Sequence, residues 1–258
     1  MKRIAILGDA HVGHRVGLHP PEYQSGNRKQ MNRLVSRWNW FENKINELKP
    51  FDLAIWMGDM CDGLGKDTSE CILPDLNRQI RGAIKIVETV GARTNYFVYG
   101  TPFHVRTKDG LELETEVAKH FVNPNGKPAQ IHGQIWVKID DYILDCRHAP
   151  ASKSSIPTSK GLPIAKERES NLRWHLEGVQ PLATHYFRGH VHYLYEAGEP
   201  NRWQGFAVPA LQDFGTKYGR QLSNVVHLGF GCLDITEGEW PTWTIHEAPR
   251  KKARLLKL

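Results

Sequence analysis

The stretch Gly189-His190-Val191-His192 places two imidazoles two residues apart, directly after the apolar run that ends at Arg188. Two further clusters, Asp9-Ala10-His11 and Gly58-Asp59-Met60-Cys61-Asp62, each follow a short apolar run of their own. Runs of this length are typical of buried strands, and ligands of open α/β sheets gather beyond the carboxyl ends of such strands. The three clusters therefore predict one site, built from carboxylate and imidazole side chains, at one edge of a sheet.

Strand and helix patterns alternate in the first half of the chain. The runs 4–7, 53–57 and 96–99 are short and apolar, as buried strands are. Amphipathic patterns between them predict helices over residues 31–48 and 76–87. This alternation predicts a mostly parallel sheet that is covered by helices.

The second half of the chain is richer in strands. Apolar or alternating runs predict them at 134–139, 142–146, 182–188, 193–196, 205–208, 225–235 and 243–246. Asp140-Asp141 lies between the first two runs and predicts a hairpin turn. Two packed sheets with helices outside accommodate so many strands better than one very wide sheet.

Composition indicates one large domain, residues 1–249, because 258 residues with 40% hydrophobic side chains can bury a full α/β core. No apolar run is long enough to cross a bilayer, so we expect no membrane association. Met1-Lys2-Arg3 leads straight into a strand pattern, so no secretory signal is expected. The four cysteines show no Cys-x-x-Cys spacing, which favours a reduced, cytoplasmic protein.

The formal net charge of +6 is concentrated at one end of the chain, because residues 250–258 carry five Lys or Arg and no acid. Such a tail can contact nucleic acid or an acidic partner, although a solvated terminus explains it equally well. A basic segment with Arg28, Lys29, Arg33 and Arg37 also favours nucleic acid.

The spacing of the ligands indicates how they would share two cations. Asp9 and His11 are two residues apart just past a strand, so both side chains can turn to one side and chelate one cation. Asp59 follows the next strand, and a carboxylate between two cations can give one oxygen to each. Asp59 is therefore expected to bridge the two ions, while His190 and His192 can each reach a different one.

His148 follows another predicted strand and completes a set of six candidate metal ligands: Asp9, His11, Asp59, His148, His190 and His192. Carboxylate and imidazole ligands without thiolate suit Mn²⁺, Fe, Zn²⁺ or Ni²⁺. Two such ions about 4 Å apart polarise phosphoryl oxygens and lower the pKa of a bridging water, which attacks in line. A nearby histidine is the expected proton donor to the leaving oxygen.

The order Asp-x-His, Gly-Asp-x-x-Asp, a glycine turn with a His, a lone His and Gly-His-x-His resembles the calcineurin-like metallophosphoesterase superfamily, over Asp9 to His192. The resemblance implies an α/β fold, a four-layer αββα sandwich of two mixed β-sheets flanked by helices. It implies two divalent metal ions, one on Asp9, His11, Asp59 and His192, the other on Asp59, His148, His190 and an Asn. Asp62 is expected to hold a ligand histidine in place.

The block Gly100-Thr101-Pro102-Phe103-His104 departs from the family's Gly-Asn-His-Asp or Gly-Asn-His-Glu. Thr101 stands in the place of the Asn, and His104 comes two residues later than the family's His. Either His104 is the general acid, with Thr101 or water at the second metal, or His104 is itself the missing ligand. We favour the general acid. The variant block resembles those of phage- and prophage-encoded members of the family.

Arg147 is a candidate phosphate contact beside His148, although strand alternation would also let it point away. The predicted function is Mn²⁺-dependent hydrolysis of phosphodiesters in nucleotides or nucleic acids, with Asp59 and His104 as catalytic residues. A phosphomonoesterase or protein phosphatase ranks lower, because the Gly-Asn-His-Glu block and the paired arginine motifs are missing. A metal-free scaffold of the same fold ranks lowest, because it would have lost more ligands than the Asn.

Overall fold

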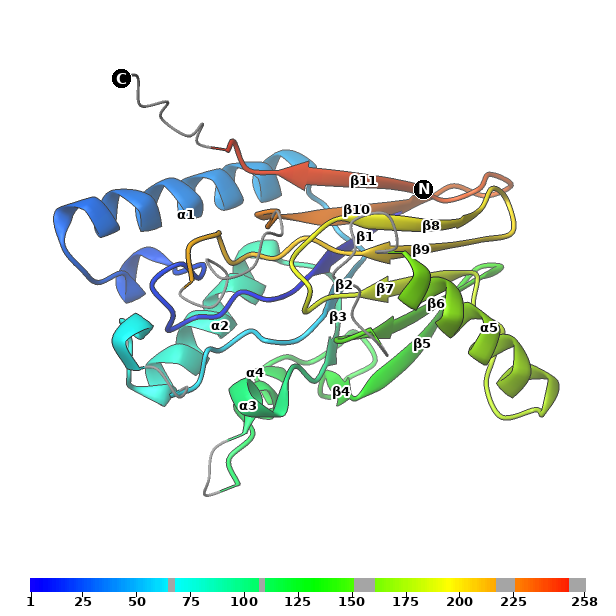
Figure 1. Ribbon diagram of the computed structural model, residues 1–258, viewed down its shortest axis with the longest axis horizontal. Helices are drawn as coiled ribbons and strands as arrows, with labels where there is room; N and C mark the ends of the chain where they lie inside the picture. Colours follow the sequence, from blue (N-terminus) through cyan, green and yellow to red (C-terminus); the bar gives the residue numbers. More distant parts are fainter. Residues whose placement is uncertain (65–67, 107–109, 151–160, 217–225, 251–258) are drawn as a thin grey trace, which may run out of the picture.

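The computed structural model describes residues 1–64, 68–106, 110–150, 161–216 and 226–250 (Figure 1). The helices are η1 (Pro21–Tyr23), α1 (Arg28–Leu48), η2 (Thr68–Glu70), α2 (Leu76–Val90), α3 (Pro102–Val105), α4 (Leu113–Lys119) and α5 (Leu162–Leu176). The strands are β1 (Lys2–Leu7), β2 (Leu53–Trp56), β3 (Thr94–Val98), β4 (Gln130–His132), β5 (Gln134–Ile139), β6 (Tyr142–Arg147), β7 (His185–Arg188), β8 (Tyr195–Glu199), β9 (Trp203–Ala207), β10 (Gly229–Ile235) and β11 (Thr242–Glu247).

These strands form two mixed sheets, in the orders β11-β10-β1-β2-β3-β4 and β5-β6-β7-β9-β8. In the first sheet β1 to β4 run parallel, and β10 and β11 add an antiparallel edge. In the second sheet β6, β7 and β9 run parallel between antiparallel edge strands. Parallel strands end at the same edge of their sheet, so the residues that follow them are brought together.

Side-chain alternation along β1 creates the layers. Ala5 and Leu7 pack with α1 and α2 on the outer face of the first sheet. Ile4 and Ile6 point the other way and pack between the two sheets. Ile164 of α5 packs on the outer face of the second sheet. The four-layer αββα sandwich expected from the sequence is therefore confirmed, with α1 and α5 on opposite sides (Figure 1).

Local sequence signals place the two long helices of the first half. Asn27 caps α1 by accepting a hydrogen bond from the backbone of Gln30, and Asp75 caps α2 through Arg78 in the same way. α2 ends at Gly91, whose φ of 61° is the left-handed conformation that favours glycine at this position. Both helices were predicted, and the structure starts α1 and ends α2 three residues beyond the expected bounds.

The strand bounds of the second half differ more from the prediction. β7 begins at His185, later than the expected run 182–188, and β10 begins at Gly229, while residues 217–225 lie outside the described part. β4 was not expected at all. Its three residues are too few for their alternation to indicate a strand, and they pair with β3 in parallel. Pairing of this kind is a tertiary effect that local periodicity does not report.

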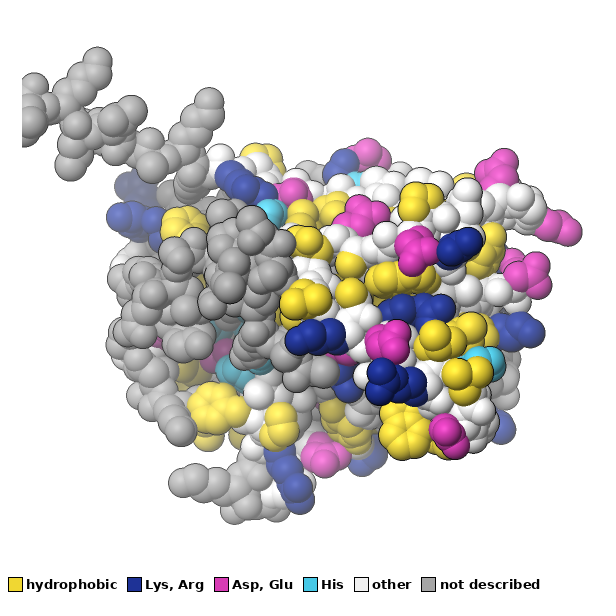
Figure 2. Space-filling model, turned by 45° about the vertical axis from the view of Figure 1, so that its right-hand side comes forward, with side chains coloured by type: hydrophobic (Ala, Val, Ile, Leu, Met, Phe, Trp, Pro, Cys, Tyr) yellow, Lys and Arg dark blue, Asp and Glu magenta, His cyan; other side chains and the backbone are white. Residues whose placement is uncertain are grey.

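The predicted basic segment is only partly available to a partner. Arg28, Lys29 and Arg33 are exposed on α1. Arg37 is 5% exposed, and its Nε lies 3.2 Å from the carboxylate of Asp213. Arg37 therefore connects α1 to the loop that contains Asp213. Because it is buried, it is not part of a nucleic-acid surface, contrary to the expectation from the sequence. On the face over α5, basic, acidic and apolar side chains are intermixed (Figure 2).

The basic C-terminal tail lies almost wholly outside the described residues, which end at Arg250. Arg250 itself forms an ion pair with Glu247 at the end of β11. A contact of the tail with nucleic acid therefore stays a prediction. Within the described part of the chain, every helix is too short or too polar to cross a membrane.

Candidate metal centre

Five of the six candidate ligands have a left-handed backbone conformation. Their φ angles are 53° at Asp9, 45° at His11, 50° at Asp59, 65° at His190 and 55° at His192. Residues other than glycine adopt this conformation rarely, and it costs on the order of 1 kcal/mol or more for each residue. Such strain persists only where surrounding contacts fix it, and it gathers at functional sites.

Backbone hydrogen bonds hold the first two ligand clusters side by side. The N–H of Asp9 donates to the carbonyl of Gly58 at 2.8 Å, and the N–H of His11 donates to the carbonyl of Asp59 at 2.9 Å. The pairing of β1 with β2 thus continues beyond the strand ends. A Cβ on Gly100 would lie 2.2 Å from Oδ1 of Asp59, so only glycine lets the loop after β3 approach.

A first ligand group contains Asp9, His11 and His192, whose candidate ligand atoms all lie within 4.8 Å of one another. Oδ1 of Asp9 is 3.0 Å from Nε2 of His192, and Oδ2 accepts the backbone N–H of His190 at 3.1 Å. Nδ1 of His11 lies 3.1 Å from Oδ1 of Asp62, while its buried Nε2 has no hydrogen-bond partner among the residues that the structure describes. A buried, unpartnered imidazole nitrogen of this kind fits a metal ligand.

A second group contains Asp59, His148 and His190, again within 4.8 Å. Nδ1 of His148 donates to the carbonyl of Met57 at 2.6 Å, which turns Nε2 toward Oδ2 of Asp59 at 3.0 Å. A ligand histidine typically donates its other ring N–H to a carbonyl or carboxylate, as His148 does here. Nε2 of His11 lies 4.0 Å from the same oxygen of Asp59. Asp59 therefore lies between the two groups, where a bridging carboxylate would have to be.

Thr101 faces the second group. Its hydroxyl oxygen is 3.0 Å from Oδ2 of Asp59, 3.2 Å from Nε2 of His148 and 3.2 Å from Nδ1 of His190. Its backbone N–H donates to Oδ1 of Asp59 at 2.7 Å. Thr101 thus contacts every member of the second group.

His104 belongs with the other side of the centre. Its Nδ1 lies 2.8 Å from the backbone carbonyl of Asp62, and its ring centroid is 4.7 Å from that of His11. His104, His11 and Asp62 form a further cluster of potential ligand atoms, which does not include Asp59, His148 or His190. His104 therefore lies beside the first ligand group and not within the second.

Opposite charges balance one another within the centre. Burial by itself would raise the pKa of Asp59, but the charge of His148 and the hydrogen bond to it hold that pKa well below its usual range. Burial also opposes protonation of His148, yet Asp59 raises its pKa to about 10. In the same way His192 overcomes burial and lowers the pKa of Asp9. Both carboxylates are therefore ionised, as metal binding requires, and a bound cation would take the place of imidazolium protons.

Comparison with known proteins shows which solved structures have a similar fold. No protein-family model and no curated protein matches the chain. Among solved structures, a double mutant of Vps29 from Entamoeba histolytica is 14% identical, with 96% of this chain and 99% of that chain covered and a TM-score of 0.51. The chain shares the fold of this Vps29 structure, and its two mixed sheets with outer helices are consistent with the metallophosphoesterase fold.

Two other solved structures are similar at lower scores. Wild-type Vps29 of Entamoeba histolytica complexed with Zn²⁺ is 14% identical, with 95% and 98% of the two chains covered and a TM-score of 0.45. A novel archaeal phosphodiesterase is 14% identical, with 95% and 99% covered and a TM-score of 0.46. Kinship with phage-type members of the superfamily stays a prediction.

Within this fold, a buried glutamate that the sequence did not single out joins two ligand loops. Glu114 of α4 accepts hydrogen bonds from the backbone of Met60 at 3.0 Å and of Gly100 at 2.7 Å. These residues directly follow Asp59 and precede Thr101. Burial and the negative charge of Asp59 raise the pKa of Glu114 to about 7. The sequence offered one indication of this role, because Glu114 is an acid on the otherwise apolar face of α4.

A second buried glutamate, Glu167 of α5, holds the ends of β6 and β7. One of its oxygens lies 2.9 Å from Nη2 of Arg147, and the other lies 2.6 Å from Nε of Arg188. These arginines immediately precede His148 and Gly189. Arg147 therefore has a carboxylate partner in α5, and its contact with phosphate stays a prediction.

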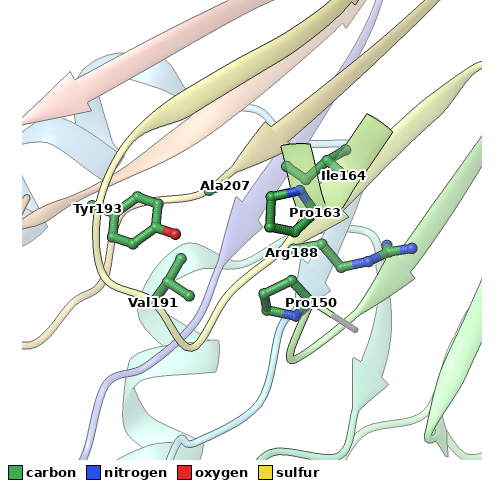
Figure 3. A pocket seen from close by; sticks show the side chains of 7 residues that line it. All are labelled: Pro150, Pro163, Ile164, Arg188, Val191, Tyr193 and Ala207. Carbon is green, nitrogen blue, oxygen red and sulfur yellow. The ribbon is translucent and has the colours of Figure 1, made fainter. Parts of the chain in front are cut away.

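A small pocket lies beside Val191, in the loop after β7 (Figure 3). It is lined by Pro150, Pro163, Ile164, Arg188, Val191, Tyr193 and Ala207. The guanidinium of Arg188 points away from Val191 and Tyr193. None of the six candidate ligands lines this pocket, so it is separate from the metal centre.

Proposed function

We propose that this chain is a divalent-metal-dependent phosphoesterase that hydrolyses phosphodiesters of nucleotides or nucleic acids. The observation that carries the proposal is the presence of two ligand groups that meet at one buried carboxylate, Asp59. Carboxylates and imidazoles suit Mn²⁺, Fe, Zn²⁺ or Ni²⁺, and we propose Mn²⁺ first. The proposed ligands are Asp9, His11, Asp59 and His192 for one ion, and Asp59, His148 and His190 for the other.

Two cations held there would polarise the phosphoryl oxygens and activate a water for in-line attack. The chain supplies the rigid arrangement that this chemistry needs. Asp62 fixes the ring of His11, and the carbonyl of Met57 fixes the ring of His148. Each ring therefore presents Nε2 to the centre without reorganisation.

His104 is the proposed proton donor to the leaving oxygen. The carbonyl of Asp62 holds its Nδ1, so Nε2 is left for the substrate, and the side chain is 22% exposed. Burial and the charge of His11 lower the pKa of His104 more than Asp59 and Asp62 raise it. A lowered pKa makes the protonated ring a stronger acid, while a smaller fraction of the ring is protonated at neutral pH.

The surroundings of the centre favour a diester over a monoester. A monoester carries a second negative charge, which arginine forks commonly neutralise. The two arginines nearest to the ligand loops in sequence, Arg147 and Arg188, are both bound to Glu167. A phosphomonoesterase is therefore the second candidate.

The proposal is tested by Mn²⁺-dependent hydrolysis of bis(p-nitrophenyl) phosphate beside p-nitrophenyl phosphate. We expect faster turnover of the diester, and a loss of about 100-fold or more in Asp59→Asn, which removes a charge from both cation sites. Asp141→Asn removes a carboxylate from an exposed turn and should leave the rate unchanged.

The other outcomes separate the alternatives. Faster turnover of the monoester would replace the diesterase with a phosphomonoesterase. Turnover that is unaffected in Asp59→Asn would contradict the assigned centre. A purified protein that binds no metal and hydrolyses neither compound would contradict the enzyme and leave a scaffold of the same fold.

A further inference from the structure

The second ligand group contains a fourth donor atom that is neither a carboxylate nor an imidazole. The hydroxyl of Thr101 lies 3.0 Å from Oδ2 of Asp59 and 3.2 Å from the facing nitrogens of both His148 and His190. Nε2 of His148 is itself 3.0 Å from Oδ2 of Asp59. The hydroxyl therefore lies at similar distances from all three members of the group.

These separations are those of ligands that share one cation. Donor atoms about 2.1 Å from a metal lie about 3.0 Å apart at right angles and about 3.4 Å apart at tetrahedral angles. The contacts of Thr101, at 3.0 to 3.2 Å, fall within this interval. The hydroxyl can donate its one proton to Asp59 and still has lone pairs on the side of His148 and His190, where a cation shared with these imidazoles would lie.

The local backbone gives independent support. Thr101 occupies the N-cap position of α3, where a threonine hydroxyl ordinarily accepts a hydrogen bond from the helix. Its side chain makes no such bond and points to the ligand group instead. The N–H of Thr101 is fixed on Asp59 at 2.7 Å, and Gly100 allows this close approach. The residue is held by its backbone while its hydroxyl remains available.

We propose that the Thr101 hydroxyl is the fourth protein ligand of the cation held by Asp59, His148 and His190. This assignment rests on the metal centre of the proposed function. A neutral hydroxyl oxygen is a hard ligand, of the kind that holds Mg²⁺ in P-loop enzymes, so it suits Mn²⁺. The chain thus fills with a hydroxyl the place where the motif resemblance implies an Asn amide.

The test measures metal binding without any substrate. Metal-free protein is titrated with Mn²⁺ in a calorimeter, and magnetic coupling between two bound ions is followed by electron paramagnetic resonance. Thr101→Val has nearly the same shape but lacks the hydroxyl, whereas Thr101→Ser retains it. The matched control is Thr89→Val, which removes an exposed hydroxyl of α2 that binds only the carbonyl of Lys85.

We expect wild type, Thr101→Ser and Thr89→Val to bind two coupled ions. Thr101→Val should bind one ion as before and the second at least about tenfold more weakly, with loss of the coupling. Thr101→Asn, which restores a neutral oxygen, should again bind two. Thermal unfolding of the metal-free variants verifies that they fold, and Thr101→Ala replaces the valine variant if it does not.

Equal affinity for two ions in wild type and Thr101→Val would overturn the proposal, as would a wild type that binds only one ion. A different outcome would contradict the proposed function. A wild type that binds two coupled ions yet hydrolyses neither phosphoester would contradict the phosphoesterase and leave the role of Thr101 intact.

Discussion

The imidazole of His11 and the carboxylate of Asp62 are joined by a contact of 3.1 Å between Nδ1 and Oδ1. This contact decides which ring nitrogen of His11 faces the centre, namely the buried Nε2, which has no hydrogen-bond partner in the described part of the chain. Burial opposes protonation of His11, but Asp62 and Asp59 raise its pKa nevertheless. Asp62 therefore acts through His11, which it orients.

Asp62→Asn should weaken the first cation site. An amide no longer supplies the negative charge that orients the His11 ring and raises its basicity, so we expect Mn²⁺ affinity to fall about 10- to 100-fold. Titration with Mn²⁺ measures this, with Asp141→Asn as the control. Unchanged affinity in Asp62→Asn would show that His11 needs no such support.

Glu114→Gln should destabilise the protein and disturb both loops that it joins. A glutamine has one acceptor oxygen, so either the N–H of Met60 or that of Gly100 would face an NH₂ group. We expect a loss of about 1–3 kcal/mol in the free energy of unfolding. Urea unfolding of metal-free protein measures it, and Glu116→Gln on the outer side of the same helix serves as control. If Glu114→Gln lowers the free energy of unfolding no more than Glu116→Gln does, Glu114 does not hold the two loops together.

Glu167→Gln should cost more, because it leaves the guanidinium of Arg188 with a single carboxylate partner in a buried place. Arg188 is 1% exposed and otherwise lies 3.2 Å from Asp145. We expect a loss of about 3 kcal/mol in the free energy of unfolding. The exposed pair of Arg173 with Glu169 provides the comparison, and Glu169→Gln should cost about 0.5 kcal/mol. Similar losses in the two variants would contradict this account.

Stability should fall between pH 6.5 and 4 because of His19. Its Nε2 accepts the N–H of Gly13 at 2.8 Å, and burial lowers its pKa from 6.5 to about 4. In that interval the unfolded chain binds a proton that the folded chain does not, so stability decreases as the pH falls. The full shift corresponds to about 3 kcal/mol.

Unfolding of His19→Gln by urea at several pH values measures this contribution. The variant should show a smaller decrease of stability below pH 6.5 than wild type, whereas His175→Gln, at an exposed position of α5, should match wild type. Parallel curves for His19→Gln and wild type would mean that another group dominates the acid sensitivity.

Phe103 should contribute to substrate binding. Phe103 is 46% exposed, and its ring centroid is 5.1 Å from that of His104. Stacking of a base on an aromatic ring contributes about 1–3 kcal/mol, so Phe103→Ala should raise KM about tenfold for a nucleoside p-nitrophenyl phosphodiester. The KM for a diester without a base should stay the same, and Trp174→Ala on α5 should change neither. Equal effects on both diesters would contradict base stacking.

The sequence by itself determined the order of the elements and the identity of the candidate ligands. Apolar runs end before Asp9, Asp59 and His190, and the amphipathic helices between them predicted a layered α/β fold. These features are local, because strand and helix periodicity and a stop such as Gly91 depend on neighbouring residues. Local information also predicted that Asp62 would hold a ligand histidine.

The tertiary structure alone decided how the side chains meet. The hydroxyl of Thr101 is brought to Asp59, His148 and His190 across 42, 47 and 89 positions of the chain. Arg147 is paired with Glu167 of α5, a contact that the sequence did not indicate. Such contacts follow from the packing of two sheets and their outer helices, which also stabilises the left-handed conformations at the strand ends. The periodicity of apolar residues indicates which face of a helix or strand is buried. It does not indicate which other element packs against that face.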